Sequence, residues 1–578
     1  MGARGGRPRT ALVSWPLYRL LLGIALLPSV IAALTLQSTP IPPQPVPPLE
    51  VSGAAIVRAA AEVTTVERAA GHAHAGCCGP GSAGDLAVVP WMQRALRVFD
   101  PHPTVEQFAA VPAGRAEPVA MSNVVAYRPG TQPGLIAVIA HHDGPGGDNA
   151  ANSGLLSTLA RTLSGFSRRR GIVLVSTDGG TTGGQGAAYF AAHWPLARRI
   201  VAAIVVTSPA GASGSPLTLL TRSQEPVGPS PTLVATAAAT VSQYAGNGLA
   251  VPGFVNQLVG YAIPFAETEQ GPLLARRVPA VALAAGPPDG RSIGVAQLDG
   301  VRLGRAGTTV ANLVAALDQA PTIDSGGPPL IVMSSDRFLP APLAEVTLAV
   351  LIAPALTALL DMVARLRRRR IALAPGLIAL AWRSSTWLVG LAAIWLVSVL
   401  PGHALPSVAN PPLPGRSGAS TSGILLAVAV ALLYWRFVVR PRLRPAAPVA
   451  GWERTGGLAA GLLGLGFATL LLLAVNPFAV IVVLPAVHAW LWLPAASRGG
   501  RRGAVAAYLA GLAGPVLVLI EMGTSQGLGW SAPRALVAAV ASGYQSPALS
   551  ICFALAAAAA AQVASTLAGR YAPPHPPG

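Results

Sequence analysis

The chain has 578 residues, of which 52% are hydrophobic and only 11% are charged, so it is too apolar to be a single soluble enzyme. Its formal net charge is +18, and all 40 basic residues are arginine. Because the dense arginine clusters border apolar segments and no finger, helix-turn-helix or aromatic-interleaved basic pattern is present, we expect no nucleic-acid partner. The sequence predicts an integral membrane protein whose partner is the lipid bilayer.

The first fifty residues predict an anchor and a spacer. Several arginines precede an apolar run at Leu20–Leu36, which is typical of an uncleaved anchor helix whose basic end stays in the cytoplasm. We therefore assign residues 1–36 to a cytoplasmic N-terminus and anchor. The Pro-rich stretch that follows favours extended backbone, and residues 37–50 are predicted to form a semi-rigid linker.

Residues 51–340 predict an α/β domain. Apolar, β-branched strands alternate there with Ala- and Leu-rich helical patterns, which indicates a central mixed, mostly parallel sheet with helices on both faces. The strands that end at Arg128 and His141 read as a hairpin whose second strand is central. In such sheets, functional side chains lie at the carboxyl ends of strands, which directs attention to 141–148, 178–182 and 208–211.

The rest of the chain predicts a membrane bundle at 341–570 and a Pro-rich cytoplasmic tail at 571–578. About seven apolar segments have lengths suited to crossing a bilayer. They are Leu343–Ala364, Ser384–Leu400, Ile424–Val438, Leu458–Val475, Phe478–Leu493, Val505–Met522 and Leu549–Leu567. Arginine clusters flank alternate ends, so we expect both termini in the cytoplasm and residues 51–340 outside it.

The stretch "AVIAHHDGPGGDNAANSG", Ala137–Gly154, carries the main chemical signal. With "SNVVAYRPG" before it and "GGQGAAYF" and "RIVAAIVV" after it, this stretch resembles the extracellular zinc aminopeptidase and glutamate-carboxypeptidase-like family in order and spacing. The resemblance spans about 88–320 and implies an aminopeptidase-like fold. It also implies that His141 is a zinc ligand, that Asp143 orients the site and that Asp148 bridges two ions.

Other positions depart from the family's pattern. Asp178 is the only carboxylate near the place of the family's Glu-Glu pair, and Ser208 and Ala262 stand where two further ligands belong. Two zinc ions about 3.5–4 Å apart need several anionic or imidazole ligands and a base that activates water. We therefore expect no bound cofactor and a degenerate, non-hydrolytic domain. One alternative is a single metal ion held by His141 or His142, Asp148 and Asp178. Another is an active extracytoplasmic zinc aminopeptidase with an altered metal site, in which Asp178 is a catalytic candidate.

The overall layout also has a parallel. One anchor, a degenerate peptidase-like domain and a multi-span bundle resemble the family of peptidase-like membrane subunits of GPI transamidase, in which a separate subunit is the protease. The resemblance implies a partner membrane or protease subunit. We predict a membrane-anchored, peptidase-like protein that binds a peptide or lipid-linked substrate, or a partner enzyme, at the outer membrane surface.

Four ionisable residues lie in or near the apolar segments, where charge is costly and function is a default hypothesis. Glu345 and Glu521 lie near predicted helix ends. Asp361 precedes Arg365 by four residues, which predicts an interfacial ion pair. His488 is the most deeply placed, and we interpret it as a packed, neutral histidine in preference to a ligand-contacting one.

The three cysteines do not suggest a disulfide framework. Cys77 and Cys78 are adjacent, and adjacent cysteines form a bridge only with strain. We interpret the two as small buried or loop residues in preference to a redox pair.

Overall fold

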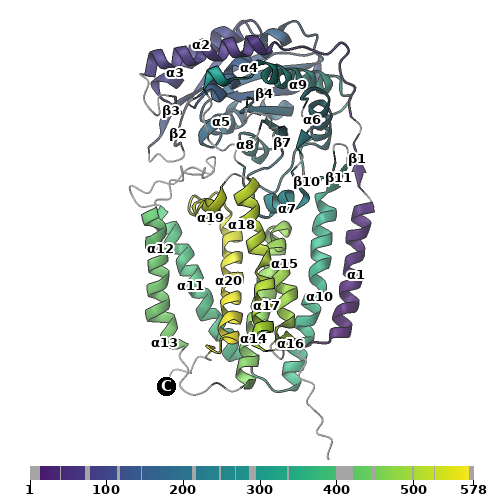
Figure 1. The fold of residues 1–578 in the computed structure, drawn as a ribbon, viewed down its shortest axis with the longest axis vertical. Coiled ribbons are helices and arrows are strands. Elements are labelled where there is room, and N and C mark those ends of the chain that lie inside the picture. The colour runs from purple at the N-terminus through teal and green to yellow at the C-terminus, as the bar shows by residue number, and fades with distance from the viewer. Residues whose placement is uncertain are drawn as a thin grey trace, which may run out of the picture.

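The computed structural model places an α/β domain above a bundle of apolar helices (Figure 1). It describes residues 13–34, 36–39, 41–71, 78–112, 117–144, 146–210, 216–246, 249–250, 252–266, 268–285, 294–334, 337–398, 421–443, 449, 451–496, 500–525 and 528–571. The predicted cytoplasmic ends at 1–12 and 572–578 lie outside the described residues.

The α/β domain is built on an eight-stranded sheet with the order β2-β3-β5-β4-β6-β9-β7-β8. Its four neighbouring strands β5, β4, β6 and β9 run parallel, whereas β2, β3 and β7 join antiparallel. This confirms the predicted mixed, mostly parallel sheet. The strands are β2 Thr104–Ala110, β3 Val119–Arg128, β4 Gln132–His141, β5 Arg170–Thr177, β6 Ile200–Thr207, β7 Leu217–Leu220, β8 Leu249–Ala250 and β9 Ala280–Ala284.

The predicted hairpin between β3 and β4 is wrong. The two strands do not pair, because β5 lies between them, antiparallel to β3 and parallel to β4. Every residue of β5 is buried, and a strand that is apolar on both faces belongs in the interior of a sheet. The helix after β4 returns the chain so that β5 can take this place.

Helices cover both faces of the sheet, as predicted. Alternate residues of β4 face different cores: Val138 and Ala140 face one, and Ala137 and Ile139 face the other. The larger core is covered by α4 and α9, with α2, α3 and α6 beside them, and the smaller one by α5 and α8. These helices are α2 Gly53–Gly71, α3 Ala83–Leu96, α4 Gly147–Ser164, α5 Gln185–His193, α6 Pro231–Tyr244, α8 Gln270–Ala275 and α9 Gly300–Gln319.

The bundle contains fewer long spans than the sequence predicted. Among the described residues, five helices are long and apolar enough to cross a membrane: α10 Ala341–Arg368, α11 Ala374–Ser398, Gly423–Arg442 beginning in α12, α14 Gly451–Val475 and α20 Pro547–Leu567. A sixth span arises if α17 Arg501–Gly511 and α18 Ala513–Ser525, which meet at a 47° bend, count as one. The segments predicted at Leu20–Leu36 and Phe478–Leu493 are shorter apolar helices, Trp15–Ile31 and Pro477–Trp492.

The first helix is tied to the first long span. Helix α1, Trp15–Leu34, packs along α10 (Figure 1). Just beyond their adjacent ends, β1 Gln37–Ser38 pairs with β11 Arg337–Pro340, which also pairs with β10 Leu330–Val332. The chain therefore enters and leaves the α/β domain at one corner.

Helix α7, Phe254–Ala262, and the loop after it rest on the bundle (Figure 1). The amide of Asn476 donates to the Tyr261 carbonyl at 2.8 Å, and the amide of Gln545 donates to the Pro264 carbonyl at 2.7 Å. The Ala266 N–H donates to the Tyr544 hydroxyl at 2.7 Å. Since this loop leads directly to residues at the carboxyl ends of β4 and β5, that edge of the sheet lies on the bundle side.

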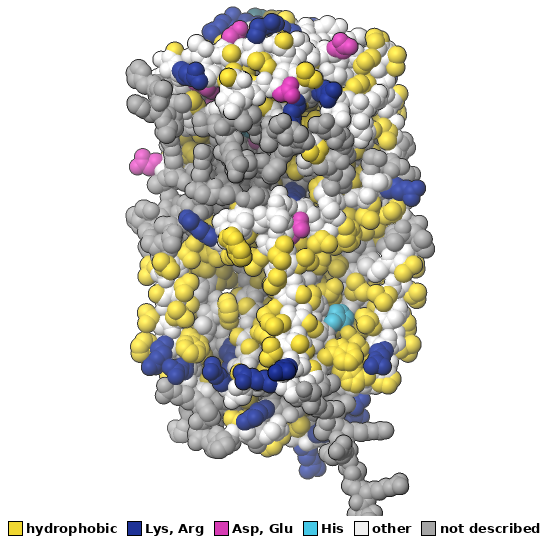
Figure 2. All heavy atoms as spheres, in the orientation of Figure 1, with side chains coloured by type: hydrophobic (Ala, Val, Ile, Leu, Met, Phe, Trp, Pro, Cys, Tyr) yellow, Lys and Arg dark blue, Asp and Glu magenta, His cyan; other side chains and the backbone are white. Residues whose placement is uncertain are grey.

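Figure 2 shows hydrophobic side chains covering much of the visible surface of the bundle and arginines gathered at its lower end. The last turn of α10 contributes Arg365, Arg367 and Arg368, and α17 begins with Arg501 and Arg502. A band of apolar surface bounded by arginines is the form expected of a membrane-spanning bundle.

Candidate functional site

The candidate site forms where β4 and β5 end side by side. His141 is in register with Thr177, so the residues that follow, His142 with Asp143 and Asp178, leave the same edge of the sheet. Parallel neighbours always bring their carboxyl ends together in this way. All of these side chains are buried.

Two more acids reach this edge from helices. Asp85 lies in the first turn of α3, which is capped by the Ser82 hydroxyl, and Glu269 immediately precedes α8. Sequence reasoning missed both. Glu269 had a signal, because it is an acid that closely follows Ala262, where the family resemblance implied a ligand. Asp85 had none, because the strand ends that it meets are distant from it in sequence.

His141 is enclosed by protein groups. Its Nε2 atom lies 3.2 Å from Asn149 Oδ1 and 3.0 Å from the side-chain amide of Asn152, both on α4. Its Nδ1 atom lies 3.6 Å from Glu269 Oε2, and Glu269 Oε1 accepts a hydrogen bond from the Thr177 hydroxyl. Burial alone lowers the pKa of His141, but Glu269, Asp143 and Asn149 outweigh it and raise that pKa to about 9.

Asp143 accepts hydrogen bonds from the turn that follows β5. One carboxylate oxygen accepts the Gly180 N–H at 2.7 Å, and the other accepts the N–H of Thr181 at 3.1 Å and the hydroxyl of Thr181. Both oxygens are therefore occupied by the loop after β5. Asp148 lies in the first turn of α4, and its side chain is outside the described residues.

Of the set implied by the family resemblance, His141 and Asp143 contact protein groups, and the side chain of Asp148 lies outside the described residues. The Nε2 atom of His141 is held by α4, its Nδ1 atom faces Glu269, and Asp143 has no oxygen to spare. A zinc ligand must direct a free lone pair at the ion. We derive no chemistry through a metal at His141.

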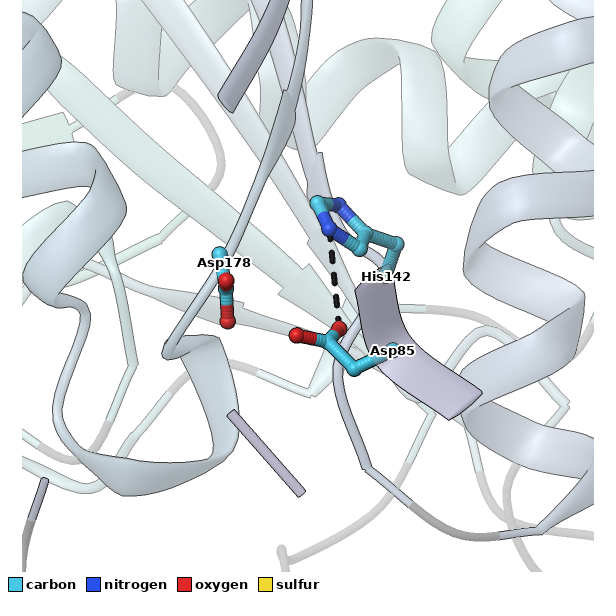
Figure 3. A group of neighbouring side chains, drawn as sticks. All are labelled: Asp85, His142 and Asp178. Atoms are coloured by element: carbon cyan, nitrogen blue, oxygen red, sulfur yellow. Dashed lines mark ion pairs between the residues drawn. The ribbon is translucent and has the colours of Figure 1, made fainter. Parts of the chain in front are cut away.

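A different group can hold a metal. Asp85, His142 and Asp178 each offer one ligand atom, and these three atoms lie within 4.8 Å of one another (Figure 3). The His142 Nε2 atom lies 3.6 Å from Asp85 Oδ1. All three side chains are at most 1% exposed.

With protein groups alone, the acids of this group favour their neutral forms. Burial, together with the negative charges of Asp178 and Asp143, raises the pKa of Asp85 to about 10. Burial and the charge of Asp143 raise the pKa of Asp178 to about 7, while the Ser122 N–H opposes the shift. Burial also lowers the pKa of His142 to about 4. Each pKa shifts in this direction because burial removes the group from water and so destabilises its charged form.

The polar residues of the bundle have local partners. The Tyr18 hydroxyl lies 2.8 Å from Nδ1 of His488, and the Leu351 carbonyl lies 3.1 Å from Nε2, an arrangement that a neutral imidazole satisfies. Asp361 pairs with Arg365 at 2.9 Å, which confirms that predicted ion pair.

Glu521 joins the bundle to the α/β domain, because it accepts a hydrogen bond from Asn256 of α7. Asn256 in turn accepts one from Arg222, which lies just after β7. Glu345, in the first turns of α10, is only partly buried. Glu521 is therefore a contact between the bundle and the α/β domain.

Cys78 lies beside the site, where its carbonyl accepts the Gly144 N–H at 2.5 Å. It is disulfide-bonded, so its interpretation as a simple loop residue is wrong. Cys552 is free and buried, and Cys77 lies outside the described residues.

No family model matches the sequence, and no curated protein does. Solved structures are similar to about half of the chain. A glutaminyl cyclase from an Acidobacteriales bacterium is 15% identical over 49% of this chain and 99% of its own, with a TM-score of 0.37. BSAP, a zinc aminopeptidase from Bacillus subtilis, is 11% identical over 46% of this chain and 95% of its own, with a TM-score of 0.36.

A Zn-dependent exopeptidase from Parabacteroides distasonis is 13% identical over 46% of this chain and 98% of its own, with a TM-score of 0.34. In each comparison nearly all of the solved chain is covered, whereas about half of the present chain has no counterpart in it.

Proposed function

We propose that the protein is a membrane-anchored, peptidase-like binding protein that does not hydrolyse peptides. One observation carries the proposal: the described acids and histidines at the carboxyl edge of β4 and β5 are buried, so a substrate does not reach them. His141, the most exposed of them, is 4% exposed, and Glu269 is 1% exposed. A group that activates water must reach the substrate or a water beside it.

The ligand would bind where this edge of the sheet meets the bundle. Phe254 and Val255 begin α7 and are 44% and 38% exposed, next to the contacts of α7 with α15 Val480–Ala489 and α18. Exposed apolar side chains at a membrane-facing junction suit a ligand with an apolar part. We commit to a lipid-linked peptide. The layout shared with the peptidase-like subunits of GPI transamidase supports a separate protease subunit as the enzyme.

The proposal includes an orientation and a division of the chain. Residues 51–340 form the binding domain outside the cytoplasm, 341–570 form the bundle, and 37–50 link the domain to its anchor. The arginines at the end of the bundle remote from the sheet support this orientation, because basic flanks stay on the cytoplasmic side (Figure 2).

Two assays of the full chain in nanodiscs test the proposal. In the first, aminoacyl fluorogenic peptides with added zinc should be hydrolysed no faster by the wild type than by His141→Ala or Asp148→Ala. Zinc-dependent hydrolysis that disappears in both variants would establish the alternative, an active zinc aminopeptidase.

The second assay places a photoreactive residue at position 254 or, as a control, at position 301. Val301 is also exposed, but it begins α9, whose first turn packs against α2, away from the bundle. A lipid-anchored peptide should crosslink at 254 and not at 301, whereas the same peptide without its lipid should crosslink weakly at both. Equal crosslinking at the two positions, or none, would refute binding at this junction.

A further inference from the structure

We propose that Asp85, His142 and Asp178 bind one divalent metal ion of the zinc type, and that this ion is structural. The site is distinct from the one that the family resemblance implied at His141. It is also independent of the proposed function, because a buried ion without access to substrate is compatible with a binding protein.

The first argument is the pattern of free atoms. Asp85 Oδ1, His142 Nε2 and Asp178 Oδ1 are buried and have no hydrogen-bond partner. One ligand atom of each of the three side chains lies within 4.8 Å of the others. Three unpartnered polar atoms in one place are costly unless something binds them all. A single cation satisfies the three together.

The second argument is that the other atom of each side chain is fixed. The Gly81 N–H donates to Asp85 Oδ2 at 2.9 Å, and the Ser122 N–H donates to Asp178 Oδ2 at 3.1 Å. Nδ1 of His142 lies 2.9 Å from the Ser176 hydroxyl. A metal-ligating imidazole that uses Nε2 needs such a partner on Nδ1 to fix its tautomer and ring orientation.

The third argument is distance. Ligand atoms about 2.1 Å from a tetrahedral zinc ion lie roughly 3.4 Å from one another. The 3.6 Å between His142 Nε2 and Asp85 Oδ1 is close to this value, and it is too long for a hydrogen bond. The distances from Asp178 to the other two ligand atoms are at most 4.8 Å, so the group would contract around a bound ion.

The fourth argument is charge and donor type. No described arginine forms an ion pair with Asp85 or Asp178, so two buried carboxylates lack a cation. One imidazole and two carboxylates suit Zn²⁺ or Mn²⁺ better than Ca²⁺ or Mg²⁺, which prefer oxygen alone, and of the first two Zn²⁺ binds more tightly. The ion would fasten the beginning of α3 to the ends of β4 and β5.

The test measures metal content in the full chain, purified in detergent without a polyhistidine tag. After dialysis into metal-free buffer, the wild type should retain about one zinc ion per chain by elemental analysis, because the three ligands are buried. Asp85→Asn, His142→Gln and Asp178→Asn should each lower zinc to background. His193→Gln is the matched control, because His193 is an exposed histidine of the same domain, and it should retain zinc.

A second measurement guards against variants that fail to fold. A strong chelator should lower the thermal unfolding temperature of the wild type, and added zinc should restore it. The proposal would be overturned if the wild type held no zinc and if neither the chelator nor added zinc changed its unfolding temperature. So would zinc that survives His142→Gln but is lost in His141→Gln, since the ion would then lie at His141. Bound zinc without peptide hydrolysis would support both the metal site and the proposed function. If the protein neither held zinc nor hydrolysed peptides, only the metal site would be rejected.

Discussion

Two adjacent histidines at the end of β4 have opposite environments because successive strand residues point to opposite faces. His141 meets Glu269, which precedes α8 on one face, and His142 meets Asp85 of α3 on the other. The sequence could locate the pair at a strand end. It could not show which carboxylate each histidine faces, because that depends on helices 50 residues or more away in the chain.

A buried carboxyl group on α2 predicts a pH dependence of stability. Glu67 is 2% exposed, and burial raises its pKa to about 7 against the opposing charge of Arg68. Between the unfolded value near 4.5 and about pH 7, the folded state binds more protons than the unfolded one. The free energy of unfolding therefore falls as pH rises through this window, by up to about 3 kcal/mol.

Glu67→Gln should remove this loss, so the variant should gain in thermal unfolding temperature over the wild type at pH 8 and much less at pH 4.5, measured by scanning fluorimetry. Glu62→Gln, on an exposed position of the same helix, is the control and should leave the difference between the two pH values unchanged. Equal behaviour of the two variants would show that Glu67 is not protonated more readily in the fold.

At the scale of elements, local patterns located the central strands of the sheet and the helix after β4. They did not predict which strands pair. The fully apolar strands at β5 and β6 and the helix after His141 could be found from periodicity. Helices α2 and α3 could not be assigned a role, because their contacts with α4 join segments distant in sequence. The same non-local pairing separates β3 from β4 and brings Asp85 to the site.

The contact of α2 with α4 requires a glycine. A Cβ atom at Gly154 would lie 2.6 Å from the Ile56 carbonyl oxygen and 3.0 Å from the Ala60 nitrogen, both backbone atoms of α2. The helices would have to separate, and overpacking of this kind costs about 1–3 kcal/mol. Gly154→Ala should lower the thermal unfolding temperature of the α/β domain.

Gly165→Ala is the matched control at the end of the same helix. A Cβ atom there meets nothing within 4 Å, and its φ of −88° suits any residue. It should leave the unfolding temperature within error of the wild type. If both substitutions were neutral, the close approach of α2 and α4 would not be maintained in solution.

At the scale of the whole molecule, composition indicated a membrane bundle and the patterning indicated an α/β domain, and both are present. Some of the predicted apolar runs form helices that are short, such as Pro477–Trp492, or bent, such as the pair α17 and α18. The docking of α7 on the bundle had no sequence signal, since it depends on single side chains such as Asn476 and Tyr544.

That docking is open to a direct test by hydrogen exchange. Tyr544→Phe removes the acceptor of the buried Ala266 N–H, and an unsatisfied buried donor costs about 1–3 kcal/mol. Amide exchange across 262–266 should accelerate about tenfold or more, as measured by mass spectrometry in detergent.

Tyr434→Phe removes a tyrosine hydroxyl that bonds only within the bundle, to Ser385, and should leave exchange at 262–266 unchanged. Unaltered exchange in Tyr544→Phe would mean that other contacts alone hold the loop in place.

The adjacency of α1 and α10 constrains the order of biosynthesis. Residues 35–340 must be made before α10 exists, which takes roughly 15–60 s at ordinary elongation rates. Throughout this interval α1 has no partner helix in the nascent chain. Its Leu20, Ile24 and Leu27 remain outward-facing even in the finished molecule, so most of its surface is already suited to lipid. If α1 is the anchor that we propose, the ribosome completes the whole α/β domain while this one apolar helix tethers the chain to the bilayer.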